Sequence, residues 1–338
     1  MTCKKVLIYL FLALIMTSCK TKEAVTNYVE TDNSYASGFP DKNIYDQLDD
    51  VSKTIKRVEC LTFYKSYVLE ENNPLKKGML TKENLKKYAV ADEVTHASVS
   101  GTATIIYYDS KKVGILTCAH VVDFADTIYN WEDDEQTKLY SVAIKLRQKI
   151  YVSGLPSGGS IQIVAMDKKN DIVLLKKELE ENHEKPKVFS IKKGNPEDLE
   201  WGTLVYIMGY PSGDLMITRA IVSNPGRIKR GTFLTDAVYN RGISGAPVFA
   251  YRKNTRDFEW VGMAKSSSVD KFYYLKPDEE HRDPGNVEQL YTGNEYIGQY
   301  TRIKYGVAHS VTVDAIVRFL KSHKQELEAA GISLENLN

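Results

Sequence analysis

The sequence predicts an all-β fold, a sandwich or a barrel, followed by one C-terminal helix. Short runs rich in Val, Ile, Tyr and Thr follow one another along most of the chain, with turn residues between them. Long helical patterns do not separate these runs, which argues against a fold built on a parallel sheet. The 338 residues are 43% hydrophobic, so the chain has enough apolar side chains for a substantial core.

The first residues have the features of a secretion signal. Lys4 and Lys5 precede an apolar run over residues 6–16, and small residues follow it. The run is too short to span a bilayer comfortably. The stretch MTSC resembles the lipobox of bacterial lipoproteins, whose cysteine, here Cys19, becomes the lipidated mature N-terminus; Met16 stands where that box more often has leucine. The alternative is an ordinary cleaved signal with an incidental cysteine.

We therefore expect residues 1–18 to be a lipoprotein signal peptide and Cys19 to be the lipidation site. More than one acyl chain on that cysteine would hold the protein stably on a membrane, outside the cytoplasm, in the periplasm or at the cell surface. Residues 19–50 are polar and lack periodicity, which is typical of a flexible tether.

The expected strands and helices follow this tether. The strands are predicted over residues 102–108, 113–122, 140–152, 160–166, 171–176, 203–210, 217–223, 246–251 and 260–264. A short helix is predicted within residues 80–88. The C-terminal helix begins after Thr312, whose hydroxyl can cap it, and Asp314 in its first turn suits the helix dipole. Gly331 is a plausible stop.

Composition and cysteine spacing argue against nucleic acid, metal ions and cofactors as binding partners. The 45 basic and 44 acidic residues nearly cancel, so nothing in the charge favours nucleic acid. Neither a CxxC pair nor a zinc spacing occurs, and we expect neither a metal nor a cofactor. Cys60 and Cys118 could pair in an oxidising compartment or remain free buried thiols, and both alternatives stay open.

Three short segments carry candidate chemistry. His120 ends the strand-like run in TCAHVV, Asp171 precedes an apolar run in NDIVLL, and Ser244 lies between two glycines in GISGAP. A serine attacks a carbonyl only when a base removes its proton and another group orients that base. A histidine, an aspartate and a serine are the residue types that such a site needs.

These segments resemble, in this order, the signature segments of the trypsin-like, chymotrypsin-fold serine peptidases. MGYPSG, TRAIVS and WVGMA are similar to segments of the bacterial HtrA-like branch, here without a PDZ domain. The resemblance covers roughly residues 51–322. It implies two packed antiparallel six-stranded β-barrels, over about 51–180 and about 188–311, with a helix from 312. Residues 323–338 are then a C-terminal helical tail.

The resemblance also implies a serine endopeptidase that hydrolyses protein or peptide substrates through an acyl-enzyme. His120 would take the proton of Ser244, and Asp171 would hold the imidazole in the right tautomer. The backbone N–H groups of Gly242 and Ser244 would form the oxyanion hole. Gly242 and Gly245 would allow the backbone dihedrals that this loop requires.

Two positions near the serine bear on specificity and on the loop. Ile243 stands where relatives have aspartate or asparagine, which leaves open how the oxyanion loop is held. Val238 takes the place of the floor of the P1 pocket, so an apolar P1 residue is favoured. The strand around Met263, Ala264 and Lys265 would bind the substrate backbone by β-addition.

The alternative is a catalytically degenerate, protein-binding lipoprotein on the same scaffold. An α/β-hydrolase elbow is disfavoured, because Ala246 replaces its last glycine and a strand rather than a helix follows. Residues 265–305 are an insertion whose tyrosines are expected to cover a hairpin. The sequence determines neither the oligomeric state nor any role of this insertion in access to the site.

Overall fold

The computed structural model describes residues 32–40, 43–109, 111–133, 135–156, 160–180, 183–226, 230–277 and 295–333. From Ser34 onward the chain forms one compact unit. The signal segment and Cys19 lie outside the described residues. The strands of this unit are β1 (Ile55–Leu69), β2 (Ala89–Tyr108), β3 (Lys112–Thr117), β4 (Thr127–Trp131), β5 (Leu139–Val152), β6 (Ile161–Asp167), β7 (Ile172–Glu178), β8 (Lys192–Lys193), β9 (Leu204–Gly209), β10 (Met216–Asn224), β11 (Thr232–Thr235), β12 (Pro247–Arg252), β13 (Asp257–Pro277) and β14 (Glu295–Thr312).

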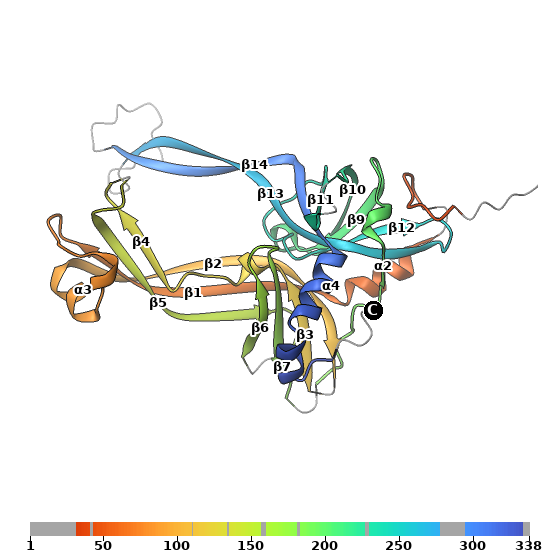
Figure 1. The fold of residues 1–338 in the computed structure, drawn as a ribbon, viewed down its shortest axis with the longest axis horizontal. Helices are drawn as coiled ribbons and strands as arrows, with labels where there is room; N and C mark the ends of the chain where they lie inside the picture. Colours follow the sequence, from red (N-terminus) through yellow and green to blue (C-terminus); the bar gives the residue numbers. More distant parts are fainter. Residues whose placement is uncertain are drawn as a thin grey trace, which may run out of the picture. The chain divides into compact units, whose positions relative to one another are not determined.

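Helices are few and short (Figure 1). They are α2 (Tyr45–Ser52), α3 (Lys82–Tyr88), α4 (Val313–Ser322) and α5 (Lys324–Ala329), with single 3₁₀ turns at η1 (Lys77–Met79), η2 (Ala119–Val121), η3 (Pro196–Asp198) and η4 (Pro211–Gly213). The prediction of an all-β fold is confirmed, because strands make up most of the regular structure of the described chain.

The first sheet has seven strands in the order β4-β5-β1-β2-β3-β7-β6. Its neighbouring strands β3 and β7 are mostly buried, as the apolar run in each of them predicts. Among the described residues no pairing joins β5 to β6, so this sheet stays open where the expected six-stranded barrel would close. The additional strand is β4, which pairs with the outer side of β5.

The second sheet does close. Its order is β12-β9-β10-β11-β14-β13, and β12 also pairs with β13, so these six strands form a continuous ring. The short β8 adds one parallel pairing to β13. Beyond the ring, β13 and β14 remain paired as far as Pro277 and Glu295, which gives the hairpin expected in the insertion. On this hairpin the rings of Phe272 and Tyr300 stack with centroids 5.2 Å apart.

The two sheets and the C-terminal helix share one hydrophobic core. Leu116 and Leu174 of the first sheet belong to the same buried cluster as Phe249 and Trp260 of the second. Ile316 of α4 joins this cluster, and α4 packs against β13 and β14 (Figure 1). This common core fixes the strands that hold the candidate site.

Both predicted helices are present, and a threonine caps each. The hydroxyl of Thr81 accepts a hydrogen bond from Asn84 N (3.1 Å) at the start of α3. The hydroxyl of Thr312 accepts one from Ala315 N (3.2 Å) at the start of α4. The C-terminal helix is interrupted at His323 before α5 begins, and Gly331 follows α5 with a φ of 71°.

The segment expected to be a tether differs from that expectation where it is described. Tyr35 is buried and forms an isolated bridge with Arg252. Ala36 N donates to Tyr251 O (2.9 Å), and the helix α2 precedes β1. The ordered part of the chain therefore begins before residue 51, because an aromatic side chain in this polar stretch has a buried site on the second sheet. Within the described residues, no helix is both long and apolar enough to cross a membrane.

Candidate active site

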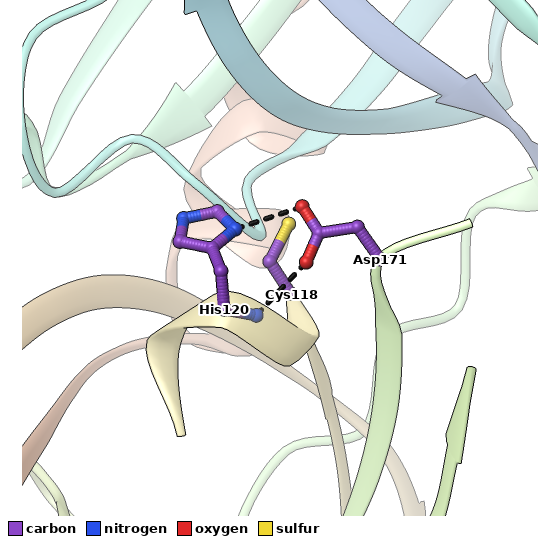
Figure 2. A group of neighbouring side chains, drawn as sticks. All are labelled: Cys118, His120 and Asp171. Carbon is purple, nitrogen blue, oxygen red and sulfur yellow. Dashed lines mark hydrogen bonds and ion pairs between the residues drawn. The ribbon is translucent and has the colours of Figure 1, made fainter. Parts of the chain in front are cut away.

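His120 and Asp171 lie together, although they come from different elements. The ring Nδ1 of His120 is 2.7 Å from Oδ2 of Asp171, and His120 N donates to Oδ1 of the same carboxylate (2.9 Å). Figure 2 shows both contacts. The carboxylate therefore holds the imidazole and the backbone that carries it, and it fixes the direction of the ring.

The position of Asp171 depends on a bend just before β7. Its φ is 63°, a left-handed conformation that few residues other than glycine adopt and that aspartate tolerates better than most. The Asp171 side chain is 10% exposed, whereas the side chain of His120 is 43% exposed. One edge of the imidazole thus contacts a buried carboxylate, and the rest of the ring is accessible to a ligand.

Cys118 is a neighbour of this pair that sequence analysis did not place in the site. Its thiol donates to Ala264 O (3.3 Å), and burial, followed by the charge of Asp171, raises the pKa of the thiol well above its usual value. Cys60 is also free and buried, so the two cysteines are not paired. The signal for Cys118 was its position two residues before the histidine in TCAHVV.

The same three side chains have a spacing that a metal ion could use. Ligand atoms of Cys118, His120 and Asp171 all lie within 4.8 Å of one another (Figure 2). A metal takes a cysteine as its thiolate, whereas the Cys118 thiol here donates a hydrogen bond to Ala264 O. Nδ1 of His120 is also engaged by the carboxylate. The geometry fits a hydrogen-bonded His–Asp pair better than a ligand set.

Ser244 lies on a loop in which two positions require glycine. Gly242 and Gly245 have φ values of 102° and 93°. A Cβ on Gly242 would overlap the carbonyl oxygen of Tyr210, and one on Gly245 would overlap that of Thr102. The requirement for glycine on both sides of the serine is therefore steric as well as conformational.

Two N–H groups of the loop have no hydrogen-bond partner among the described residues. Arg241 O accepts from Ser212 N (2.8 Å), and Ile243 O accepts from Ala246 N (2.9 Å). In a trans peptide the N–H group points opposite to the C=O group of the same peptide. The N–H groups of Gly242 and Ser244 therefore point in the opposite direction to the carbonyls of Arg241 and Ile243. Neither of them donates a hydrogen bond within the described part of the chain. These are the two N–H groups that the sequence proposed as oxyanion donors.

The hydroxyl of Ser244 points to a different partner from the one expected. It donates to Lys265 O (3.1 Å), and no hydrogen bond joins it to His120 among the described residues. The main chain of the serine is tied to the first sheet, because Ser244 O accepts from Thr102 N (2.8 Å). The structure thus brings His120 and Asp171 into direct contact and leaves the Ser244 hydroxyl turned toward β13.

The residues expected to bind substrate differ in how far their side chains are exposed to solvent. Val238 is 57% exposed, which is unlike the closed floor of a specificity pocket. The side chains of Met263 and Ala264 are buried, so this strand can offer a ligand only its backbone there. Lys265 is half-buried, and its carbonyl holds the Ser244 hydroxyl.

Comparison with known families covers the central part of the chain. Residues 101–263 match the family model described as trypsin-like peptidase domain. This segment contains His120, Asp171 and Ser244. This part of the chain is therefore similar to trypsin-like peptidase domains, and no match is found among curated proteins.

Three solved structures are similar at low sequence identity. A serine endoprotease from Yersinia pestis is 15% identical, with a TM-score of 0.41, over 83% of this chain and 66% of that one. This chain therefore spans just under two thirds of the length of that enzyme. A protein described as GrC is 11% identical (TM-score 0.37; 82% of this chain and 96% of that one). Kallikrein-related peptidase 10 is 10% identical (TM-score 0.33; 67% and 90%).

Proposed function

We propose that this protein is a serine endopeptidase that cleaves protein substrates through an acyl-enzyme. The observation that supports this most directly is the 2.7 Å contact between His120 Nδ1 and Asp171 Oδ2. A carboxylate on Nδ1 leaves Nε2 unprotonated in the neutral ring, which is the form that a general base needs. The trypsin-like peptidase match over residues 101–263 supports the same reading.

The first step is the attack of Ser244 Oγ on the substrate carbonyl. The hydroxyl turns from Lys265 O to Nε2 of His120, which takes its proton, and Asp171 stabilises the imidazolium that forms. The oxyanion accepts hydrogen bonds from the N–H groups of Gly242 and Ser244, which have no other partner among the described residues.

The remaining steps return the site to its starting state. The imidazolium gives its proton to the leaving amine, and the C–N bond breaks to leave an acyl-Ser244. Water then attacks the ester while His120 takes its proton, and the imidazolium returns that proton to Ser244 Oγ as the C–Oγ bond breaks and the acid product departs. The partly exposed ring of His120 leaves room for both the amine and the water.

The proposed specificity is for an apolar P1 side chain. Val238 brings no charge to the position where this family reads P1, and although its exposure is unlike a closed pocket floor, it leaves an apolar side chain accessible there. The substrate backbone would pair with the strand at Lys265, whose carbonyl holds Ser244 at rest. Cleavage profiling on a peptide library tests this proposal, and a dominant basic P1 preference would contradict it.

The proposed location is outside the cytoplasm, on a membrane, through a lipid on Cys19. The lipobox-like MTSC and the basic, apolar start of the chain support this. Among trypsin-like peptidases we place the protein nearest the HtrA-like branch, because MGYPSG, TRAIVS and WVGMA resemble segments of that branch. Metabolic labelling with a fatty acid, lost in Cys19→Ser, tests the anchor; labelling that persists in this variant would contradict it.

The central experiment removes the nucleophile. Ser244→Ala should lower turnover by roughly 10⁶-fold, and labelling by a fluorophosphonate should disappear with it. Ser223→Ala, on β10 and outside the site, is the matched control and should retain both. If the Ser244→Ala variant cleaved peptides as fast as the wild type, the proposed mechanism would be ruled out.

One observation favours the alternative of a protein-binding lipoprotein with a degenerate site. The Ser244 hydroxyl donates to Lys265 O rather than to His120. If that contact persists when substrate is present, the serine cannot be deprotonated. Absence of fluorophosphonate labelling of the intact wild-type protein, together with partner binding that survives Ser244→Ala, would establish this alternative.

A further inference from the structure

Thr102 lies at the junction between the first sheet and the serine loop. It is a fully buried residue of β2 and belongs to none of the motifs that point to a peptidase. Its backbone N donates to Ser244 O (2.8 Å). Its backbone O accepts from the hydroxyl of Thr117 (2.7 Å). Both main-chain groups are therefore fixed, which fixes where the side chain starts.

The hydroxyl of Thr102 connects two segments of the second sheet. It donates to Gly242 O (2.7 Å) and accepts from Tyr210 N (2.9 Å). The donor and one acceptor site of the hydroxyl are thus both used inside the protein. A side chain of the first sheet thereby holds together the loop that contains Ser244 and the end of β9.

Three glycines make room for this arrangement. A Cβ on Gly209 would come within 2.6 Å of the Thr102 hydroxyl, and a Cβ on Gly245 would overlap the Thr102 carbonyl. On Gly242 it would overlap the carbonyl of Tyr210, whose N–H is bound to Thr102. The chain surrounds one threonine with residues that have no side chain, which is expected where a close backbone approach matters.

The bond to Gly242 O completes the fixing of three consecutive peptides. The carbonyls of Arg241 and Ile243 have backbone donors, and among the described residues the carbonyl of Gly242 has only the Thr102 hydroxyl as a donor. The peptide between Gly242 and Ile243 is the one that joins the two proposed oxyanion donors. Its rotation would redirect both of them, because neighbouring peptides share a Cα.

We propose that Thr102 is the positioning residue that keeps the oxyanion loop in its working shape. Ile243 is buried and has no polar side chain for this purpose, so the brace comes from the other sheet. This inference rests on the proposed peptidase function, since it assigns a role in the same site. Thr102 touches neither substrate nor reacting atoms and acts through Gly242.

The test compares two substitutions of Thr102 with one at Thr104. Thr102→Val keeps the shape and removes the hydroxyl, and should lower kcat by about 10- to 100-fold with little change in KM, since oxyanion donors act in the transition state. Thr102→Ser keeps the hydroxyl and should stay within about threefold of the wild type. Thr104→Val, two residues along β2 and also buried, makes the same change away from the loop and should leave kcat unchanged.

A second measurement separates this inference from the proposed function. Amide hydrogen exchange of the peptide that covers residues 240–246 needs no activity. It should be at least tenfold faster in Thr102→Val than in the wild type or Thr104→Val. A wild type that fluorophosphonate does not label would defeat the peptidase proposal, while exchange would still decide the role of Thr102. Unchanged exchange in Thr102→Val, or a kcat equal to that of Thr104→Val, would overturn the inference.

Discussion

Asp171 contacts His120 twice, through the ring and through the backbone N–H, and this double contact supports the role of preorganised base that we propose for the pair. A carboxylate that held only the ring would leave the 3₁₀ turn η2 free to shift relative to β7. With both oxygens engaged, the imidazole and its backbone move together. The cost is a left-handed backbone conformation at Asp171, which is the kind of local strain found at functional sites.

Replacing this carboxylate with an amide tests its electronic role while the shape is kept. Asp171→Asn should lower kcat by about 10⁴-fold, because an amide that donates to Nδ1 favours the wrong imidazole tautomer. Peptidase assays with the folded variant measure this loss. Asp123→Asn, which alters an ion pair with Lys168 away from the serine, is the control and should stay near wild-type activity. A loss of less than tenfold in Asp171→Asn would mean that the carboxylate does not orient the base.

Sequence motifs could place the His–Asp pair and the glycines, but they could not place Thr102 or orient Ser244. The motif residues have side chains with few other uses in such contexts. A threonine in a strand is ordinary, and the partners of its hydroxyl lie at Tyr210 and Gly242, over 100 positions away. Among the described residues the Ser244 hydroxyl donates to Lys265 O (3.1 Å), a contact that no local sequence pattern encodes.

At the scale of elements, the C-terminal helix α4 was predicted well because its signals are local. Thr312 caps the first turn, and six of the ten residues from Val313 to Ser322 are buried on one face. Pairing between distant strands is a different matter. The closure of the second sheet through β12 and β13, the open edge of the first and the extra strand β4 depend on contacts that periodicity does not specify.

The cap of α4 offers a quantitative check at this scale. Thr312→Ala should lower the free energy of unfolding by about 1 kcal/mol, since Ala315 N loses its acceptor at the helix start. Thr312→Ser retains the oxygen and should lose a few tenths at most. Chemical denaturation measures both. Equal stability of the alanine and serine variants would show that the cap contributes nothing.

At the scale of the whole molecule, a buried polar network around Tyr35 attaches the start of the compact unit to the second sheet. The Tyr35 hydroxyl donates to Glu259 (2.8 Å) and accepts from Asn195 N (2.9 Å). The guanidinium of Arg252 lies 3.7 Å from the centroid of the Tyr35 ring. Burial, followed by the hydrogen bond to Glu259, raises the pKa of the Tyr35 hydroxyl, which keeps it protonated as a donor.

Removing this side chain should destabilise the unit as a whole. Tyr35→Ala should cost about 3 kcal/mol of unfolding free energy, because it empties a buried aromatic site and removes a partner of Glu259. Tyr305→Ala, at an exposed tyrosine on β14, should change stability by less than about 0.5 kcal/mol. Thermal or denaturant unfolding distinguishes them, and equal stability of the two variants would show that the network does not anchor the segment.

The docking of Tyr35 sets a limit on how far the proposed peptidase can work from a bilayer. If Cys19 carries the proposed lipid, only about 15 residues separate it from the compact unit, and a fully extended chain spans at most about 3.5 Å per residue. The segment between Cys19 and the compact unit can then span no more than about 50 Å. This is about half the length that residues 19–50 could span if all of them were extended. Such an enzyme would reach only substrates in a thin layer next to its own membrane. Proteins that never enter this layer would not be cleaved, whatever their sequence.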